Sequence, residues 1–73
     1  MEEYSRIIIE RYWIQHPNSQ KAKRLMRLVT MSYDPGAIGN DADAIYLEGV
    51  IRREKDPELK EALKDLDDYL FGW

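Results

Sequence analysis

A run of basic residues near the middle of the chain has the residue types and spacing of a phosphate-binding surface. Between residues 20 and 30 there are four cationic side chains and no acidic one. Their spacing places all four on one side of a helix, where they could contact the phosphates of a nucleic acid. The candidate phosphate or nucleic-acid contacts are therefore Lys21, Lys23, Arg24 and Arg27.

The opposite charge gathers toward the C-terminal end of the sequence. Residues 56–73 contain six acidic side chains against Lys60 and Lys64, and the whole chain has a net charge of −3. Opposite charges attract when two segments lie side by side. We therefore prefer a structural interpretation, in which the basic second helix packs beside the acidic last helix, to one in which the basic run binds a ligand.

Groups suited to catalysis or metal binding are sparse. The chain has one histidine and no cysteine, so it lacks the commonest structural zinc ligands. His16 precedes Pro17 at an expected helix end, and the nearest acid, Glu10, lies almost two helical turns away. The acids between Asp34 and Asp43 lack the alternating oxygen ligands of a calcium-binding loop. We expect no enzymatic activity, no cofactor and no metal site.

Aromatic residues gather at the end of the sequence. Three of the last five residues are aromatic, and aromatic side chains are enriched at the energetic centres of protein interfaces. Leu70 and Trp73 continue an apolar stripe that favours burial, whereas Phe71 points off that stripe and is expected to be exposed. Trp13 also lies away from the main apolar face of its segment and could join the same surface. The candidate partner-binding residues are Trp13, Tyr69, Phe71 and Trp73.

Three prolines divide the chain into the elements that position these side chains. Proline cannot continue a helix, and it moves the preceding residue toward an extended conformation. Breaks are therefore expected near Pro17, Pro35 and Pro57. We predict an all-α fold, a compact bundle of four short helices at about residues 3–15, 19–32, 41–54 and 57–71.

The last three helices have clear sequence signals. Residues that cap helix N-termini precede each of them: Asn18 or Ser19, Asn40 or Asp41, and Asp56. Gly49 inside the third helix costs about 1 kcal/mol relative to alanine, which suggests a close approach between helices. The residues expected to face the core are Ala22, Leu25, Met26 and Val29 with Leu28 at the edge, then Ala44, Leu47, Val50 and Ile51, and finally Leu59, Leu63, Leu66, Leu70 and Trp73.

The first segment is ambiguous. Tyr4, Ile7, Ile8 and Tyr12 share one helical face, but a second apolar stripe makes the segment apolar over more than half its circumference. Isoleucine and aromatic residues are equally good strand formers. We predict a helix because acidic residues stand at its start and no partner strand follows.

Size and composition indicate a single globular domain. With 73 residues, 44% of them hydrophobic, the chain is near the lower limit at which a core sustains a fold by itself. Self-association or a dense aromatic core could supply the missing stability. Acidic residues occupy the place of a signal peptide's basic segment, and no apolar run approaches the ~20 residues needed to span a bilayer. We therefore expect a cytoplasmic protein with no membrane contact.

These observations favour a non-enzymatic regulatory or inhibitory protein that acts by protein–protein binding and forms a homodimer. In size, acidity and lack of catalytic groups the chain is similar in type to small phage and mobile-element proteins. The alternative is a DNA-binding transcription regulator with a helix-turn-helix-like core, built from the second and third helices. The loop between them is longer than the usual turn, and Asp41 and Asp43 would face phosphate.

Overall fold

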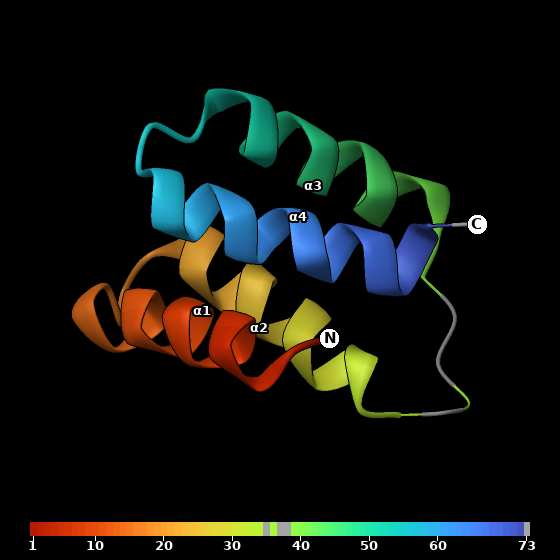
Figure 1. Ribbon diagram of the computed structural model, residues 1–73, viewed down its shortest axis with the longest axis horizontal. Helices are drawn as coiled ribbons and strands as arrows, with labels where there is room; N and C mark the ends of the chain where they lie inside the picture. The colour runs from red at the N-terminus through yellow and green to blue at the C-terminus, as the bar shows by residue number, and fades with distance from the viewer. Residues whose placement is uncertain (35, 37–38, 73) are drawn as a thin grey trace.

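A computed structural model describes residues 1–34, 36 and 39–72 of the chain. Across those residues the protein consists of four α-helices without a β-strand, which confirms the predicted all-α class (Figure 1). The observed bounds differ from the predicted ones by no more than one residue at any end. The helices are α1 (Glu3–Gln15), α2 (Gln20–Ser32), α3 (Asp41–Arg53) and α4 (Pro57–Phe71).

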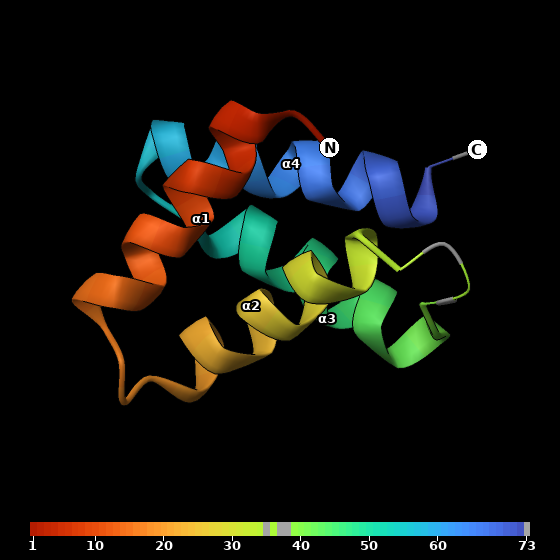
Figure 2. The same ribbon diagram turned by 90° about the horizontal axis from the view of Figure 1, so that it is seen from below.

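The last helix, α4, is the centre of the bundle. It packs against α1, α3 and α2, and α1 also packs against α2. Figure 2 shows that α1 and α2 form a V-shaped pair joined at its closed end by the short connection after α1. This arrangement leaves one side of both α1 and α2 facing away from α4.

Three of the helices start at the capping residues that the sequence indicates. In each case a backbone amide of the first turn donates a hydrogen bond to the side chain of the capping residue, which satisfies a donor that has no partner within the helix. The three donor–acceptor pairs are the Ala22 amide and Ser19 Oγ at 3.1 Å, the Asp43 amide and Asn40 Oδ1 at 2.8 Å, and the Glu58 amide and Asp56 Oδ1 at 3.0 Å.

All four helices contribute to one hydrophobic core. The predicted stripe on α4 is confirmed for its first three leucines, while Leu70 is half-buried against the core and Trp73 lies outside the described residues. On α2, Leu28 is fully buried rather than marginal, and Met26 is only partly buried. The largest fully buried side chains are Ile9, Leu25, Leu28, Val29, Leu47, Leu63 and Leu66.

Neither apolar stripe of α1 is buried as a whole. Tyr4 and Ile7 are exposed, whereas Ile8 and Ile9 are buried. The physical reason is that α1 packs against two helices, α4 and α2, so its buried strip lies between the two apolar stripes seen in the sequence. A helix that is apolar around most of its circumference has its orientation decided by its neighbours.

The explanation offered for Gly49 is also wrong. Gly49 is buried within α3, but a Cβ atom built there would meet the guanidinium of Arg53, with Nη1 at 3.0 Å. Arg53 belongs to the same helix and has a flexible side chain. No close approach of another helix among the described residues requires glycine at this position.

Candidate functional site

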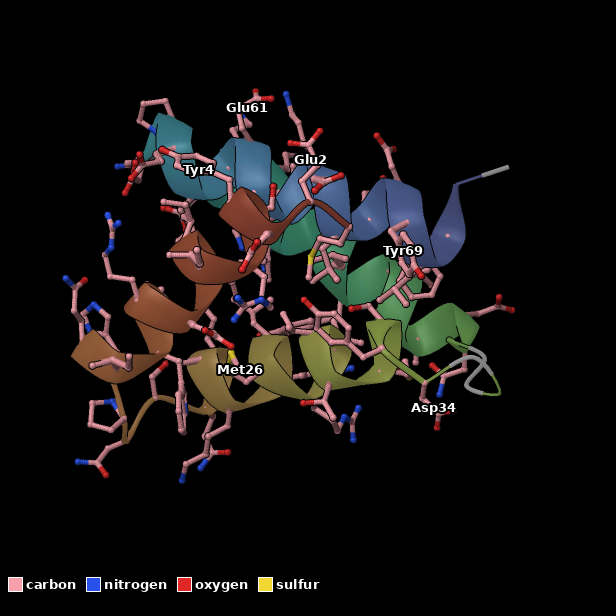
Figure 3. The ribbon with its side chains drawn as sticks, turned by 60° about the horizontal axis from the view of Figure 1, so that its bottom comes forward. Glu2, Tyr4, Met26, Asp34, Glu61 and Tyr69 are labelled. Atoms are coloured by element: carbon pink, nitrogen blue, oxygen red, sulfur yellow. The ribbon has the colours of Figure 1, made fainter. Side chains whose placement is uncertain are left out.

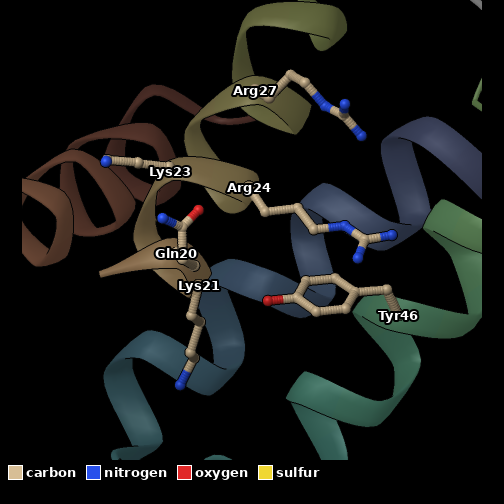
Figure 4. Close-up of a pocket in the computed structure, with 6 residues that line it drawn as sticks. All are labelled: Gln20, Lys21, Lys23, Arg24, Arg27 and Tyr46. Atoms are coloured by element: carbon tan, nitrogen blue, oxygen red, sulfur yellow. The ribbon is translucent and has the colours of Figure 1, made fainter. Parts of the chain in front are cut away.

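The four predicted basic residues lie together around one pocket between α2 and α3, shown in Figure 4. We call it the α2–α3 pocket. It is open to solvent and has a volume of about 480 Å³. The sequence therefore predicted its cationic members as a set, and the fold adds one amide and one aromatic side chain. Its lining residues are Gln20, Lys21, Lys23, Arg24, Arg27 and Tyr46.

The guanidinium of Arg24 is positioned by an aromatic ring. Its central carbon lies 3.9 Å from the ring centroid of Tyr46, the geometry of a cation–π contact. Its nearest acidic oxygen is Asp43 Oδ1, which lies 3.6 Å from Nη2 and so is beyond hydrogen-bond distance. Arg24 donates no hydrogen bond to another residue in the part of the chain that the structure describes, and its Nε is buried there without an acceptor. The guanidinium of Arg24 is therefore held in place and has hydrogen-bond donors that no described residue accepts.

A buried carboxylate lies beneath the arginines of the pocket. Asp43 is only 5% exposed, and its Oδ1 accepts a hydrogen bond from Nη2 of Arg27 at 3.2 Å. Asp43 lies in the first turn of α3, where an acidic side chain stabilises the start of a helix. Its second role, as the counter-ion of Arg24 and Arg27, depends on the packing of α3 beside α2, which the sequence does not show.

A second ion pair stands at the other end of the pocket. Nζ of Lys21 donates a hydrogen bond to Glu54 Oε1 at 3.0 Å. Burial acts to lower the pKa of Lys21, but the hydrogen bond and charge of Glu54 outweigh it and raise that pKa. Burial likewise acts to raise the pKa of Glu54, but the backbone amide of Asp56 and the ammonium of Lys21 lower it overall. Both groups therefore stay ionised near neutral pH.

The acids that balance the basic helix come from α3 and the residue after it. Within the described ranges, the α2 cations form ion pairs with Asp43 and Glu54 and with no acid of α4. The expected charge pairing between the second and last helices is therefore wrong, although α2 and α4 do pack together. Lys23 is exposed and forms no ion pair with a described residue. The four cations of α2 are therefore balanced by only two nearby carboxylates of the described residues, those of Asp43 and Glu54.

The aromatic candidates do not form one surface. The backbone amide of Glu2 donates to Asp65 Oδ2 at 2.9 Å, whereas Arg11 lies 3.5 Å from Glu58, so α1 and α4 are antiparallel. The end of α1, which carries Trp13, therefore lies near the start of α4, whereas Tyr69 lies near the end of α4 (Figures 1 and 3). Both side chains are exposed, but the structure separates them by most of the length of α4.

Phe71 is not the exposed residue that the sequence suggested. It is half-buried against the hydrophobic core, and its ring lies directly over Gly39. A Cβ atom at position 39 would overlap the ring, so glycine is what permits this contact. The prediction for Trp73 concerns a residue outside the described part of the chain.

Exposed apolar side chains gather instead on the solvent-facing side of α1. Ile7 and Ile14 are 41% and 69% exposed and are seven residues apart, which places them on the same helical face. Tyr4 and Trp13 flank them and are also exposed, although the hydroxyl of Tyr4 donates a hydrogen bond to Glu58 Oε2 of α4 at 2.6 Å. These four residues define the outer face of α1. The sequence did not indicate this surface, because either apolar stripe of the first segment was compatible with burial.

The remaining candidate is the single histidine. His16 occupies the C-terminal cap of α1, where its backbone amide donates to the carbonyls of Tyr12 and Trp13. Its ring centroid lies 4.7 Å from that of Tyr12. Within residues 1–34, 36 and 39–72, no three histidine or acidic side chains gather as metal ligands.

None of the four described helices is both long enough and apolar enough to cross a membrane. Comparisons of the chain with models of protein families, with curated protein sequences and with solved structures find no match.

Proposed function

We propose that this protein is a small cytoplasmic regulatory or inhibitory protein that acts by binding another protein or a second copy of itself, without catalysis. The observation that carries the proposal is the outer face of α1. Each Å² of apolar surface left in water costs about 25 cal/mol, and contiguous exposed apolar residues commonly mark interaction sites.

The polar surroundings of this face suit an interface. Nη1 of Arg6 donates to Glu10 at 2.8 Å, and Nη2 of the same residue donates to Glu3 at 3.2 Å. These ion pairs form within α1 and lie beside the exposed isoleucines. Protein interfaces combine apolar and polar side chains, and the exposed side of α1 provides both on one helix.

The geometry supports the DNA-binding alternative less well. Lys21, Arg24 and Arg27 each lie within ion-pair distance of an acid of this chain, so their charge is partly used by the fold. Residues 33–40 separate α2 from α3, and Asp41 and Asp43 stand at the start of the helix that would enter the major groove. DNA binding remains the second candidate because all four basic residues line one pocket.

The decisive experiment replaces both isoleucines of the outer face by glutamine, as Ile7→Gln/Ile14→Gln. Glutamine is a better helix former than isoleucine, so α1 should stay folded. The matched control is Ile45→Gln, because Ile45 is 70% exposed, much like Ile14, but belongs to α3. Sedimentation velocity measures self-association, and affinity purification from nuclease-treated lysate with mass spectrometry measures partner binding.

We expect the double variant to lose a partner, or self-association, that the wild type and the Ile45→Gln control retain. Circular dichroism should show the same helical content in all three proteins. Equal binding by the double variant and the control would refute the proposed surface. Recovery that disappears after nuclease treatment would favour the DNA-binding alternative.

A further inference from the structure

We propose that the α2–α3 pocket binds a phosphomonoester dianion, the terminal phosphate of a ligand that carries one. This site is separate from the outer face of α1, and the inference goes beyond the proposed protein binding. It concerns a single phosphate held in a pocket, which differs from the array of phosphates along a nucleic-acid duplex.

The first argument is the state of Arg24. Its guanidinium is held against Tyr46 and is still 38% exposed, and none of its donors is used in a hydrogen bond to a described residue. The planar fork of a guanidinium matches two oxygens of a phosphate. A side chain that is already ordered loses less entropy when a ligand binds, so the stacking on Tyr46 prepares Arg24 for an oxyanion.

The second argument is charge. Four cations line the pocket, and the two carboxylates beside them, Asp43 and Glu54, leave an excess of positive charge. A phosphomonoester carries about −1.5 to −2 at pH 7, which matches that excess better than a single carboxylate does. Because Lys21 and Glu54 both remain ionised near neutral pH, the excess persists there.

The third argument is the set of neutral donors on the opposite side of the pocket. Figure 4 shows the hydroxyl of Tyr46 pointing toward the start of α2, where Gln20 and Lys21 stand. A hydroxyl and a side-chain amide can each donate to a phosphate oxygen. The pocket volume of about 480 Å³ is sufficient for a small organic phosphate.

The first test compares phenyl phosphate with phenyl sulfate, which have similar shapes but differ by one negative charge at about pH 7.5. Both are titrated into 15N-labelled protein at constant ionic strength. We expect saturable amide shifts confined to residues 20–27 and 43–46, with phenyl phosphate bound about tenfold more tightly. Equal affinities for the two ligands, or shifts that do not saturate, would overturn the proposal.

The second test uses three variants. Arg24→Gln should weaken phenyl phosphate binding at least about tenfold, since a hydrogen bond to a charged group is lost. Lys23→Gln should weaken it about threefold without affecting the fold, because Lys23 is exposed and has no ion-pair partner among the described residues. The control is Arg52→Gln, which removes the same charge from an exposed position of α3 outside the pocket. Equal losses in Lys23→Gln and Arg52→Gln would show unspecific attraction and contradict the site.

The third test identifies the source of the phosphate by comparing AMP with a Gly-phosphoserine-Gly peptide. Tighter binding of AMP assigns the site to mononucleotides, and tighter binding of the peptide assigns it to phosphorylated proteins. Failure of both to bind would refute the inference. All these variants leave the outer face of α1 intact, so this result is independent of the proposed protein binding.

Discussion

The outer faces of α1 and α2 lie on neighbouring helices that cover the same core, yet they leave opposite kinds of side chain in water. The outer face of α1 exposes isoleucine and aromatic residues, whereas the corresponding side of α2 exposes lysine and arginine. In α2 the charges leave only one face that can be buried. In α1 several faces are apolar, so contacts with α4 and α2 decide which of them is covered.

The two faces also differ in how they are connected to the rest of the fold. The charges of α2 reach across to Asp43 and Glu54, so they help to hold α3 in place. The exposed isoleucines of α1 belong to no such contact with another helix. The structure therefore predicts that changes at Lys21, Arg24 and Arg27 of α2 affect both binding and stability. Changes at Ile7 and Ile14 of the outer face should affect binding alone.

The largest expected effect tests the orientation of α1. Ile9→Ala should lower the free energy of unfolding by about 2–5 kcal/mol, because Ile9 is fully buried and its loss leaves a cavity. Ile14→Ala should change it by less than about 0.5 kcal/mol, since Ile14 is exposed and alanine favours the helix. Urea denaturation measures both values. Similar losses in the two variants would mean that α1 is oriented differently.

The next effect tests the connection between α2 and α3. Asp43→Asn should cost about 1–2 kcal/mol, less than for a fully buried pair because Arg24 and Arg27 both reach solvent. Asp41→Asn is the control, since Asp41 is an exposed acid of the same helical turn. Chemical denaturation of the two variants should show the larger loss for Asp43→Asn. Equal losses would indicate that only the helix-start effect of the acids matters.

The smallest effect concerns the pair formed by Lys21 and Glu54. The pKa of Glu54 is lowered from its usual 4.5, so its stabilisation is fully present above pH 4.5 and is lost as the pH falls through the lowered pKa. Glu54→Gln should therefore cost about 0.5 kcal/mol at neutral pH, since Lys21 is partly exposed and water screens the pair.

The difference between Glu54→Gln and the wild type should vanish in acid. Thermal unfolding of both proteins at several pH values between about 3 and 7 measures it. A difference that grows as the pH falls would have the wrong sign and would exclude this ion pair as the cause.

Much of the fold could be predicted from the sequence because its signals are local. Ser19, Asn40 and Asp56 act through hydrogen bonds within their own first turns, so the start of each helix was predictable without the tertiary structure. The orientation of α1 could not be predicted in the same way. It depends on which neighbours cover Ile8 and Ile9, and the sequence of α1 alone does not contain that information.

The residues of the candidate pocket also fall into a group that the sequence could predict and a group that it could not. Its four basic residues come from one helix, so helical spacing was enough to group them. Tyr46 and Asp43 come from α3 and meet α2 only through tertiary packing. The prediction of a single aromatic surface was wrong for the same reason. The antiparallel packing of α1 and α4, a tertiary feature, separates Trp13 from Tyr69.

The contact between Phe71 and Gly39 has a consequence for local opening. It joins the last turn of α4 to the residue that precedes the cap of α3. Unfolding of either segment would therefore expose the other to solvent. Regions joined in this way usually open as one cooperative unit in native-state hydrogen exchange. The amides at the end of α4 and at the start of α3 should therefore exchange at a common rate, and Gly39→Ala should accelerate the exchange of both.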